Sequence, residues 1–263
     1  MKLSLVFPLL FILSWLTPEL ARAQEISPET IGKVVNIAGT SPVSKYSWKD
    51  RGKAPIGYIK GVAVTYAKSY AELKSGKESA VTLMSEKIGN PKNDGLAHYG
   101  LTANSNYDRL RSVFVLALGL GMRESSGNTT VGWDRSKLKL KPPIQPTEDN
   151  SEAGLFQVSW DSRRKSPWLL KLYDHYRADS SQCYLSIFEE GTTKHSESEV
   201  GTGDGLAFQK FNKACPAFAT EYVLIMLRVD RSHFGPINRK RAEYNLDAEK
   251  MFRDIEAVVD SAN

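Results

Sequence analysis

Cysteine and histidine are both scarce in this chain of 263 residues, which contains two Cys and four His. The few that occur form neither a His-Glu-x-x-His nor a Cys-x-x-Cys pattern, and the sequence has no phosphate-binding loop and no Gly-x-Ser-x-Gly elbow. Metal, nucleotide and serine-hydrolase chemistries therefore lack the groups they require. We expect a protein without a metal ion and without a cofactor.

Long apolar runs are also missing, except at the start of the chain. There, Lys2 precedes the almost uninterrupted apolar run from Leu3 to Leu16, and Ala21-Arg22-Ala23 places small residues at the two positions that a signal peptidase reads. A membrane anchor is the alternative, but this run is shorter than the roughly 20 residues that span a bilayer. We expect residues 1–23 to be a cleaved signal peptide, with export to the periplasm or out of the cell and no stable membrane insertion afterwards.

No charge of one sign dominates the chain. Lys and Arg number 35 and Asp and Glu number 30, which gives a net charge of +5. Loss of residues 1–23 would remove two basic residues and one acidic residue and leave +4. No basic stripe with interleaved aromatic residues is present, so we expect no nucleic-acid partner. A mildly basic exported protein is suited instead to an anionic polymer of the cell envelope.

The two cysteines are Cys183 and Cys215. In the oxidising compartment that export implies, an even number of Cys favours a disulfide, and neither Cys has a recognisable catalytic partner in the sequence. The expected bridge would clamp residues 186–214, a segment rich in Gly, Ser and Thr that we expect to be a loop unable to order itself by burial.

Apolar spacing predicts a mainly α fold. A helix is expected over residues 57–73, and another from Tyr107 or Asp108 after the cap-like Asn104-Ser105-Asn106. The second helix is apolar on all sides from residue 113 to 122, so it should be the buried central helix, in which Gly119 and Gly121 would allow close approach of another backbone. Further helices are expected over residues 168–177, 217–229 and 242–259, the last with Leu246, Met251, Ile255 and Val258 on its apolar face.

The remaining segments are predicted to be irregular. Residues 24–56 contain several Pro, Gly and Ser and are expected to form an irregular lead-in, followed by one catalytic domain over residues 57–263. Residues 128–152 are expected to be a loop that ends at a turn at Ala153-Gly154. A short strand or hairpin is expected, at most, over residues 156–160.

Glu124 is placed where the central helix stops. A carboxyl group at the C-terminal end of a buried helix meets the negative end of the helix dipole and a surround of low dielectric, and both favour the protonated form. Such a group can donate a proton near neutral pH, as cleavage of a glycosidic bond requires. Gly127 lets the chain leave the helix, so that the acid faces a cleft.

Other residues supply the remaining features of a saccharide site. Ser125 and Ser126 provide hydroxyl groups beside the acid. The turn at Gly154 would position Gln157, whose amide can hydrogen-bond to sugar hydroxyl or N-acetyl groups. Phe156 or Trp160 could stack on a sugar ring.

The Glu124-Ser125 pair at the end of an apolar helix, followed by Gly154-Leu155-Phe156-Gln157, resembles the Glu-Ser and Gly-Leu-Met-Gln motifs of soluble Slt-type lytic transglycosylases, within the lysozyme-like superfamily. The resemblance covers residues 108–160 and implies a lysozyme-like fold with little or no β-sheet that acts on peptidoglycan glycan strands. It implies that Glu124 acts as acid and then as base on the β-1,4 bond between N-acetylmuramic acid and N-acetylglucosamine. The nearest counterpart of the family's later Ala-Tyr-Asn-Ala-Gly segment is residues 233–238, which makes His233 and Asn238 candidates for a second wall of the site.

Two alternatives stay open. A hydrolytic lysozyme would need a second carboxylate near Glu124, and spacing cannot choose among the acidic residues that follow it. These candidates are Asp134, Glu148, Asp149, Glu152 and Asp161. The other alternative is a catalytically silent protein that uses the same scaffold to bind peptidoglycan or to assemble with a partner.

Overall fold

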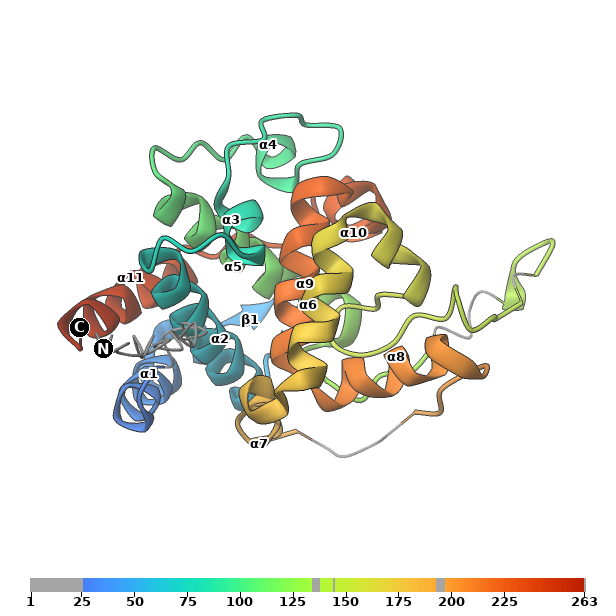
Figure 1. Ribbon diagram of the computed structural model, residues 1–263, viewed down its shortest axis with the longest axis horizontal. Helices are drawn as coiled ribbons and strands as arrows, with labels where there is room; N and C mark the ends of the chain where they lie inside the picture. Colours follow the sequence, from blue (N-terminus) through green and yellow to red (C-terminus); the bar gives the residue numbers. More distant parts are fainter. Residues whose placement is uncertain (1–25, 134–137, 144, 193–196, 263) are drawn as a thin grey trace, which may run out of the picture.

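The computed structural model describes residues 26–133, 138–143, 145–192 and 197–262, and it is mainly helical, as the apolar spacing predicts (Figure 1). The α-helices are Pro28–Thr40 (α1), Ile56–Lys74 (α2), Ala80–Ser85 (α3), Gly95–Tyr99 (α4), Asn106–Ser125 (α5), Pro167–Ala178 (α6), Leu185–Phe188 (α7), Gly203–Ala214 (α8), Pro216–Val229 (α9), Gly235–Asn238 (α10) and Leu246–Ser261 (α11). Short 3-10 helices cover Pro42–Lys45 (η1), Trp160–Lys165 (η3), Ser180–Cys183 (η4) and Arg231–His233 (η5). The strands Ser47–Trp48 (β1) and Gly52–Lys53 (β2) pair in an antiparallel hairpin.

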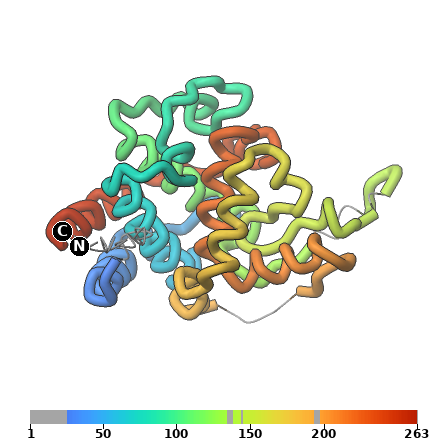
Figure 2. The backbone as a smooth tube through the Cα atoms, in the orientation of Figure 1, coloured from blue at the N-terminus to red at the C-terminus, as the bar shows by residue number. Residues whose placement is uncertain are grey.

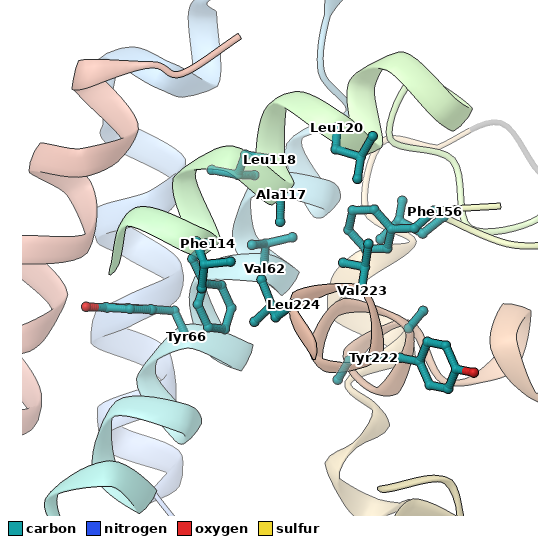
Figure 3. Close-up of a cluster of buried hydrophobic side chains, with 14 of the residues drawn as sticks. Val62, Tyr66, Phe114, Ala117, Leu118, Leu120, Phe156, Tyr222, Val223 and Leu224 are labelled. Carbon is teal, nitrogen blue, oxygen red and sulfur yellow. The ribbon is translucent and has the colours of Figure 1, made fainter. Parts of the chain in front are cut away.

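Helix α5 is the buried central helix that the sequence predicts. Its N-cap is Ser105, whose side chain accepts a hydrogen bond from the backbone N–H of Asp108. All residues from Arg111 to Met122 are buried. Helices α2 and α9 pack on α5, and Figure 3 shows apolar side chains of the three helices meeting in one cluster. Glu124, near the end of α5, therefore follows a helical segment that is buried in the apolar core.

The glycines of α5 allow the close approach that was expected. A Cβ on Gly119 would lie 2.2 Å from the carbonyl oxygen of Glu243, so the backbone ahead of α11 can pass against the helix only because that side chain is absent. At Gly121 the neighbour is a side chain, because a Cβ there would lie 2.2 Å from the hydroxyl of Tyr58. That hydroxyl donates to the carbonyl of Leu118 at 2.9 Å.

The prediction of an irregular lead-in over residues 24–56 is wrong for most of that segment. Ser27 accepts a hydrogen bond from the backbone N–H of Thr30, and Pro28 takes the first helical position, so the two residues start α1. Val34 and Ala38 are buried, and α1 packs against α2 and α11. The Pro and Ser residues that suggested irregular structure act here as a helix start signal.

Two other element predictions need correction. Helix α11 begins at Leu246 rather than at residue 242, because the side chain of Asn245 accepts hydrogen bonds from the backbone N–H groups of Asp247 and Ala248. Leu246 consequently lies in the first turn and is exposed. The predicted hairpin over residues 156–160 reduces to a single bridge between Ala153 and Val158.

The disulfide between Cys183 and Cys215 is present, as predicted, and joins the end of η4 to the start of α9. The segment that it closes is not a simple loop, since it contains α7 and α8. Phe208 of α8 is fully buried and contacts Trp160, Tyr173 and Phe218, which orders the helix by burial after all.

Residues 138–143 project away from the helices at the right of Figure 2 and are exposed. Over the described residues of the predicted 128–152 loop no α-helix or strand forms, so that prediction is confirmed there. Within the described parts of the chain, no helix is long and apolar enough to cross a membrane.

Candidate active site

The C-terminal end of α5 carries Glu124 in its last turn. Ser126 follows with φ 56° and Gly127 with φ 76°, both in the left-handed region that ends a helix. The backbone N–H of Ser126 bonds the carbonyl of Met122, and that of Gly127 bonds the carbonyl of Gly121. The chain therefore reverses directly after Glu124, as the sequence predicts.

A second turn positions Gln157. Gly154 has φ 76°, and its backbone N–H donates to the carbonyl of Val131 at 2.8 Å, which ties this turn to the loop after α5. From α8, Asn212 donates to the carbonyl of Ala153 at 3.0 Å. Gln157 itself has φ 50°, and its Nε2 donates to the carbonyl of Gly154 at 3.0 Å. This bond uses one of the two N–H donors of the amide, and Oε1 is the acceptor of the side chain.

Glu124 and Gln157 line the same pocket, which has a volume of about 760 Å³. The residues around it are Arg51, Arg123, Glu124, Val131, Gly132, Trp133, Glu152, Gln157, Glu197, Ser198 and Val200. Two residues that are 33 positions apart in the chain are thus brought to one cavity. This size suits a saccharide, since ligand pockets commonly measure about 300–1,000 Å³.

Several residues predicted to bind substrate do not line this pocket. Phe156 is fully buried, and Figure 3 shows its ring in the apolar cluster beside Val223 and Leu120. It is a core residue and not a sugar platform, because it is packed inside the hydrophobic core and does not line the pocket. Ser125 is also buried, and its hydroxyl donates to the carbonyl of Gly121 one turn back in the helix, at 3.1 Å.

Ser126, Gly154 and Trp160 have structural positions as well. Ser126 caps α5, and Gly154 shapes the turn without lining the pocket. The ring of Trp160 packs against Tyr173 and Phe208, and the guanidinium of Arg163 lies 4.0 Å from its centroid. None of these three residues lines the pocket, so each has a structural role.

Arg51 enters the pocket from the β1–β2 hairpin, a segment that was expected to be irregular. The hairpin is anchored by the buried Trp48 and by Glu243, which accepts hydrogen bonds from the hydroxyl of Tyr46 and the backbone N–H of Lys49. Nη2 of Arg51 donates to the carbonyl of Arg123. A guanidinium at the C-terminal end of α5 meets the negative end of the helix dipole, which favours this arrangement.

Another wall of the pocket comes from the segment closed by the disulfide. The backbone N–H of Glu197 donates to the carbonyl of Thr130 at 3.2 Å, and its carboxylate accepts from the N–H of Gly132 at 2.8 Å. The side chain of Gln209 on α8 exchanges two hydrogen bonds with the backbone of Val200, at 3.0 and 2.7 Å. Sequence reasoning missed this wall, because nothing local marks residues so far along the chain as neighbours of the loop after α5.

A second pocket of about 430 Å³ adjoins the first, and Trp133 and Glu152 line both. His233, predicted to form a further wall of the site, lines this second pocket and not the one that holds Glu124. Asn238 does not line it. The side chain of Asn238 accepts a hydrogen bond from Arg231 and donates one to the carbonyl of Ser232, so it holds the turn that presents His233.

Asp230 is one of the charged residues that line the second pocket. Burial raises the pKa of this carboxyl, but hydrogen bonds from Lys165 and Ser232 outweigh that effect, so its pKa lies below the ordinary value. Nζ of Lys165 lies 2.9 Å from the carboxylate. Asp230 therefore carries its negative charge throughout the neutral range.

The structure also sorts the candidates for a second carboxylate. Glu152 lines the pocket that holds Glu124, whereas Asp161 lines only the adjoining pocket and accepts from Ser159 at 2.6 Å. Glu148 packs on the turn at residues 201–205, and Asp149 lies near Arg163, so neither lines either pocket. Asp134 lies outside the described residues.

In the described ranges, no group of three or more His, Cys, Asp or Glu side chains is arranged to hold a metal ion. Comparisons of the chain with protein-family models, with curated proteins and with solved structures found no match.

Proposed function

We propose that this protein is an exported glycosidase with a lysozyme-like fold, which cleaves the β-1,4 bond between N-acetylmuramic acid and N-acetylglucosamine in peptidoglycan. The observation that carries the proposal is that Glu124, at the end of a buried helix, shares one pocket with the amide of Gln157. The disulfide supports export, because such bonds persist in oxidising compartments.

In the proposed reaction Glu124 donates its proton to the glycosidic oxygen as the bond to the muramic acid carbon breaks. The resulting carboxylate then takes the proton of an internal hydroxyl of the same muramic acid, whose oxygen bonds that carbon. The product is a 1,6-anhydro end, and one carboxyl group serves both steps. The Oε1 atom of Gln157 would accept a hydrogen bond from the sugar and hold its orientation.

A lysozyme that hydrolyses the same bond is the second candidate, and the position of Glu152 favours it. Among the described candidates, Glu152 is the carboxylate that lines the same pocket as Glu124. A carboxylate across a cleft from the acid can activate water or stabilise the sugar cation. Glu152→Gln should abolish release of reducing ends under this mechanism and should leave formation of anhydro ends largely intact under the first.

The lysis of purified sacculi tests the proposal through Glu124→Gln. Removal of a general acid should lower the rate by about 10²–10⁴-fold. Glu29→Gln is the matched control, because Glu29 lies on the exposed first turn of α1 and does not line the pocket. If the wild-type protein binds sacculi but does not cleave them, the catalytically silent alternative replaces the enzyme.

A further inference from the structure

Two arginines line the pocket, and they differ in whether a carboxylate of the protein already pairs with them. The side chain of Arg123 is committed, because Nε donates to the carbonyl of Arg241 at 2.8 Å and Nη1 lies 3.4 Å from the carboxylate of Asp50. Arg51 is exposed and uses Nη2 to bind the carbonyl of Arg123. Among the residues that the structure describes, no carboxylate pairs with Arg51.

The two contacts between the hairpin and α5 are reciprocal and fix Arg51 in place. Arg51 donates to the backbone of Arg123, while Arg123 pairs with Asp50, the residue directly before Arg51. A guanidinium held at one nitrogen retains its other N–H donors in a planar fork that matches a carboxylate. The hairpin therefore presents a preorganised anion-binding group to the pocket.

The position of this group relative to the acid is also fixed. Arg51 binds the carbonyl of Arg123, and Glu124 is the next residue, with its Cα about 3.8 Å further along the chain. The guanidinium is thus within the span of one sugar ring from the backbone that carries the acid. Apart from Arg51 and the paired Arg123, the ionisable groups of the described lining are the carboxyl groups of Glu124, Glu152 and Glu197, none of which is a cation. Among the residues that the structure describes, Arg51 is therefore the lining cation that has no carboxylate partner and can bind an anionic substituent.

We infer that Arg51 is a specificity-determining residue that binds a carboxylate on the sugar next to the scissile bond. This inference rests on the proposed function. In peptidoglycan that carboxylate has two sources, the lactyl ether of a muramic acid without its peptide and the acidic groups of an attached peptide. A neutral chitin-type chain has neither. Arg51 would thus select muramic acid-containing strands over chitin.

The test compares wild type, Arg51→Gln, Arg51→Lys and the control Lys53→Gln on three substrates. Lys53 belongs to the same hairpin, is exposed and does not line the pocket. The substrates are peptide-free glycan strands, peptide-bearing strands and a neutral N-acetylglucosamine hexamer. Loss of a charge-assisted hydrogen bond should lower kcat/KM of Arg51→Gln by roughly tenfold to a hundredfold on carboxylate-bearing strands, with little change on the hexamer. Arg51→Lys should recover part of the loss, and Lys53→Gln should match wild type.

The pattern over substrates identifies the source of the carboxylate. A loss confined to peptide-free strands indicates the lactyl group, and a loss confined to peptide-bearing strands indicates the peptide. Equal effects on all three substrates, or no effect on any, would overturn the inference while the proposed function stands. If wild type cleaves none of the three, the proposed function fails, and binding of the same strands to wild type and Arg51→Gln then decides whether Arg51 recognises the carboxylate.

Discussion

The side chain of residue 156 belongs to the core, and the next residue, Gln157, lines the pocket. Phe156 is fully buried and packs in the cluster formed by α2, α5 and α9. Truncation to Ala would leave a cavity beneath the Gly154 turn, so we expect Phe156→Ala to lower the free energy of unfolding by about 3–5 kcal/mol. Denaturant unfolding measures this change.

A Leu at the same position is the useful control for Phe156→Ala. Phe156→Leu keeps most of the apolar volume and should retain both the fold and the affinity for glycan strands. A direct stacking role of the ring would instead give normal stability with a marked loss of affinity in the Leu variant, which would contradict the core assignment.

The sequence allowed the local backbone positions of Glu124 and Gln157 to be predicted. Each residue lies within three positions of a glycine with a local backbone signal. Gly127 marks the helix end next to Glu124, and Gly154 marks the turn next to Gln157. Arg51 could not be found in this way, since its function depends on a hairpin that packs against a helix end 72 residues away. The burial of Phe156 in the core and the position of Trp133 at both pockets likewise depend on long-range packing.

At the scale of elements, helix α8 anchors the wall of the pocket that contains Val200. Gln209 is fully buried and makes two hydrogen bonds with the backbone of Val200, which lines the pocket. Each such bond contributes about 0.5–1.5 kcal/mol, and a buried apolar replacement would leave the Val200 backbone without its partners. We expect Gln209→Leu to raise KM for glycan strands several-fold with a smaller change in kcat.

Steady-state kinetics of Gln209→Leu and of Lys210→Gln provide the comparison. Lys210 is the exposed neighbour of Gln209 on α8, so its variant should keep the wild-type KM. An unchanged KM in Gln209→Leu, at normal stability, would show that the wall needs no such anchoring.

The disulfide restrains helix α8 at its C-terminal end, because Cys215 directly follows Ala214. Cys183 and Cys215 enclose a segment with a separation of 32 residues, and closing such a segment stabilises the folded state by about 2–4 kcal/mol through the entropy of the unfolded chain. We expect added reductant to lower the unfolding free energy by that amount. The double variant Cys183→Ser, Cys215→Ser should begin at the lower value and not respond to reductant, and a response of that variant would assign the effect to something other than the bridge.

The helical elements themselves were predicted wherever an apolar face repeats over several turns, as in α2, α5, α6 and α9. Helix α1 was missed because its Pro and Ser residues were interpreted as loop formers, although Ser27 and Pro28 are suited to the first positions of a helix. Short helices such as α4 and α7 contain too few residues for periodicity to be visible. Their positions follow from caps and packing rather than from pattern.

At the scale of the whole molecule, a charged network joins three helices that surround the core. Arg111 of α5 donates to Glu256 of α11 at 2.6 Å and also binds Asp108, while Tyr66 of α2 donates to Glu256. A hydrogen bond from Ser105, together with Arg111, holds the pKa of Asp108 below its ordinary value of 3.8, against the opposing effect of burial. The folded state therefore favours the ionised form of this residue.

The sign of the resulting pH dependence follows from the lowered pKa. A carboxyl whose pKa is lower in the folded state stabilises the protein above its unfolded pKa, and that contribution disappears as pH falls through the folded pKa. We expect Asp108→Asn to be less stable than wild type at about pH 7, with the difference narrowing as the pH falls below 3.8. Denaturant unfolding over this range measures it, with the exposed Asp174→Asn as the control; a difference that is constant with pH would contradict the argument.

The central claim is that Glu124 breaks a glycosidic bond in the pocket that it shares with Gln157 and Glu152. Mass spectrometry of glycan fragments, released from purified sacculi in heavy-oxygen water, tests it most directly. Wild type should release fragments with unlabelled anhydro ends, or labelled reducing ends if Glu152 directs water, and Glu124→Gln should release neither. Fragments from Glu124→Gln in wild-type amounts, or none from wild type, would contradict the account.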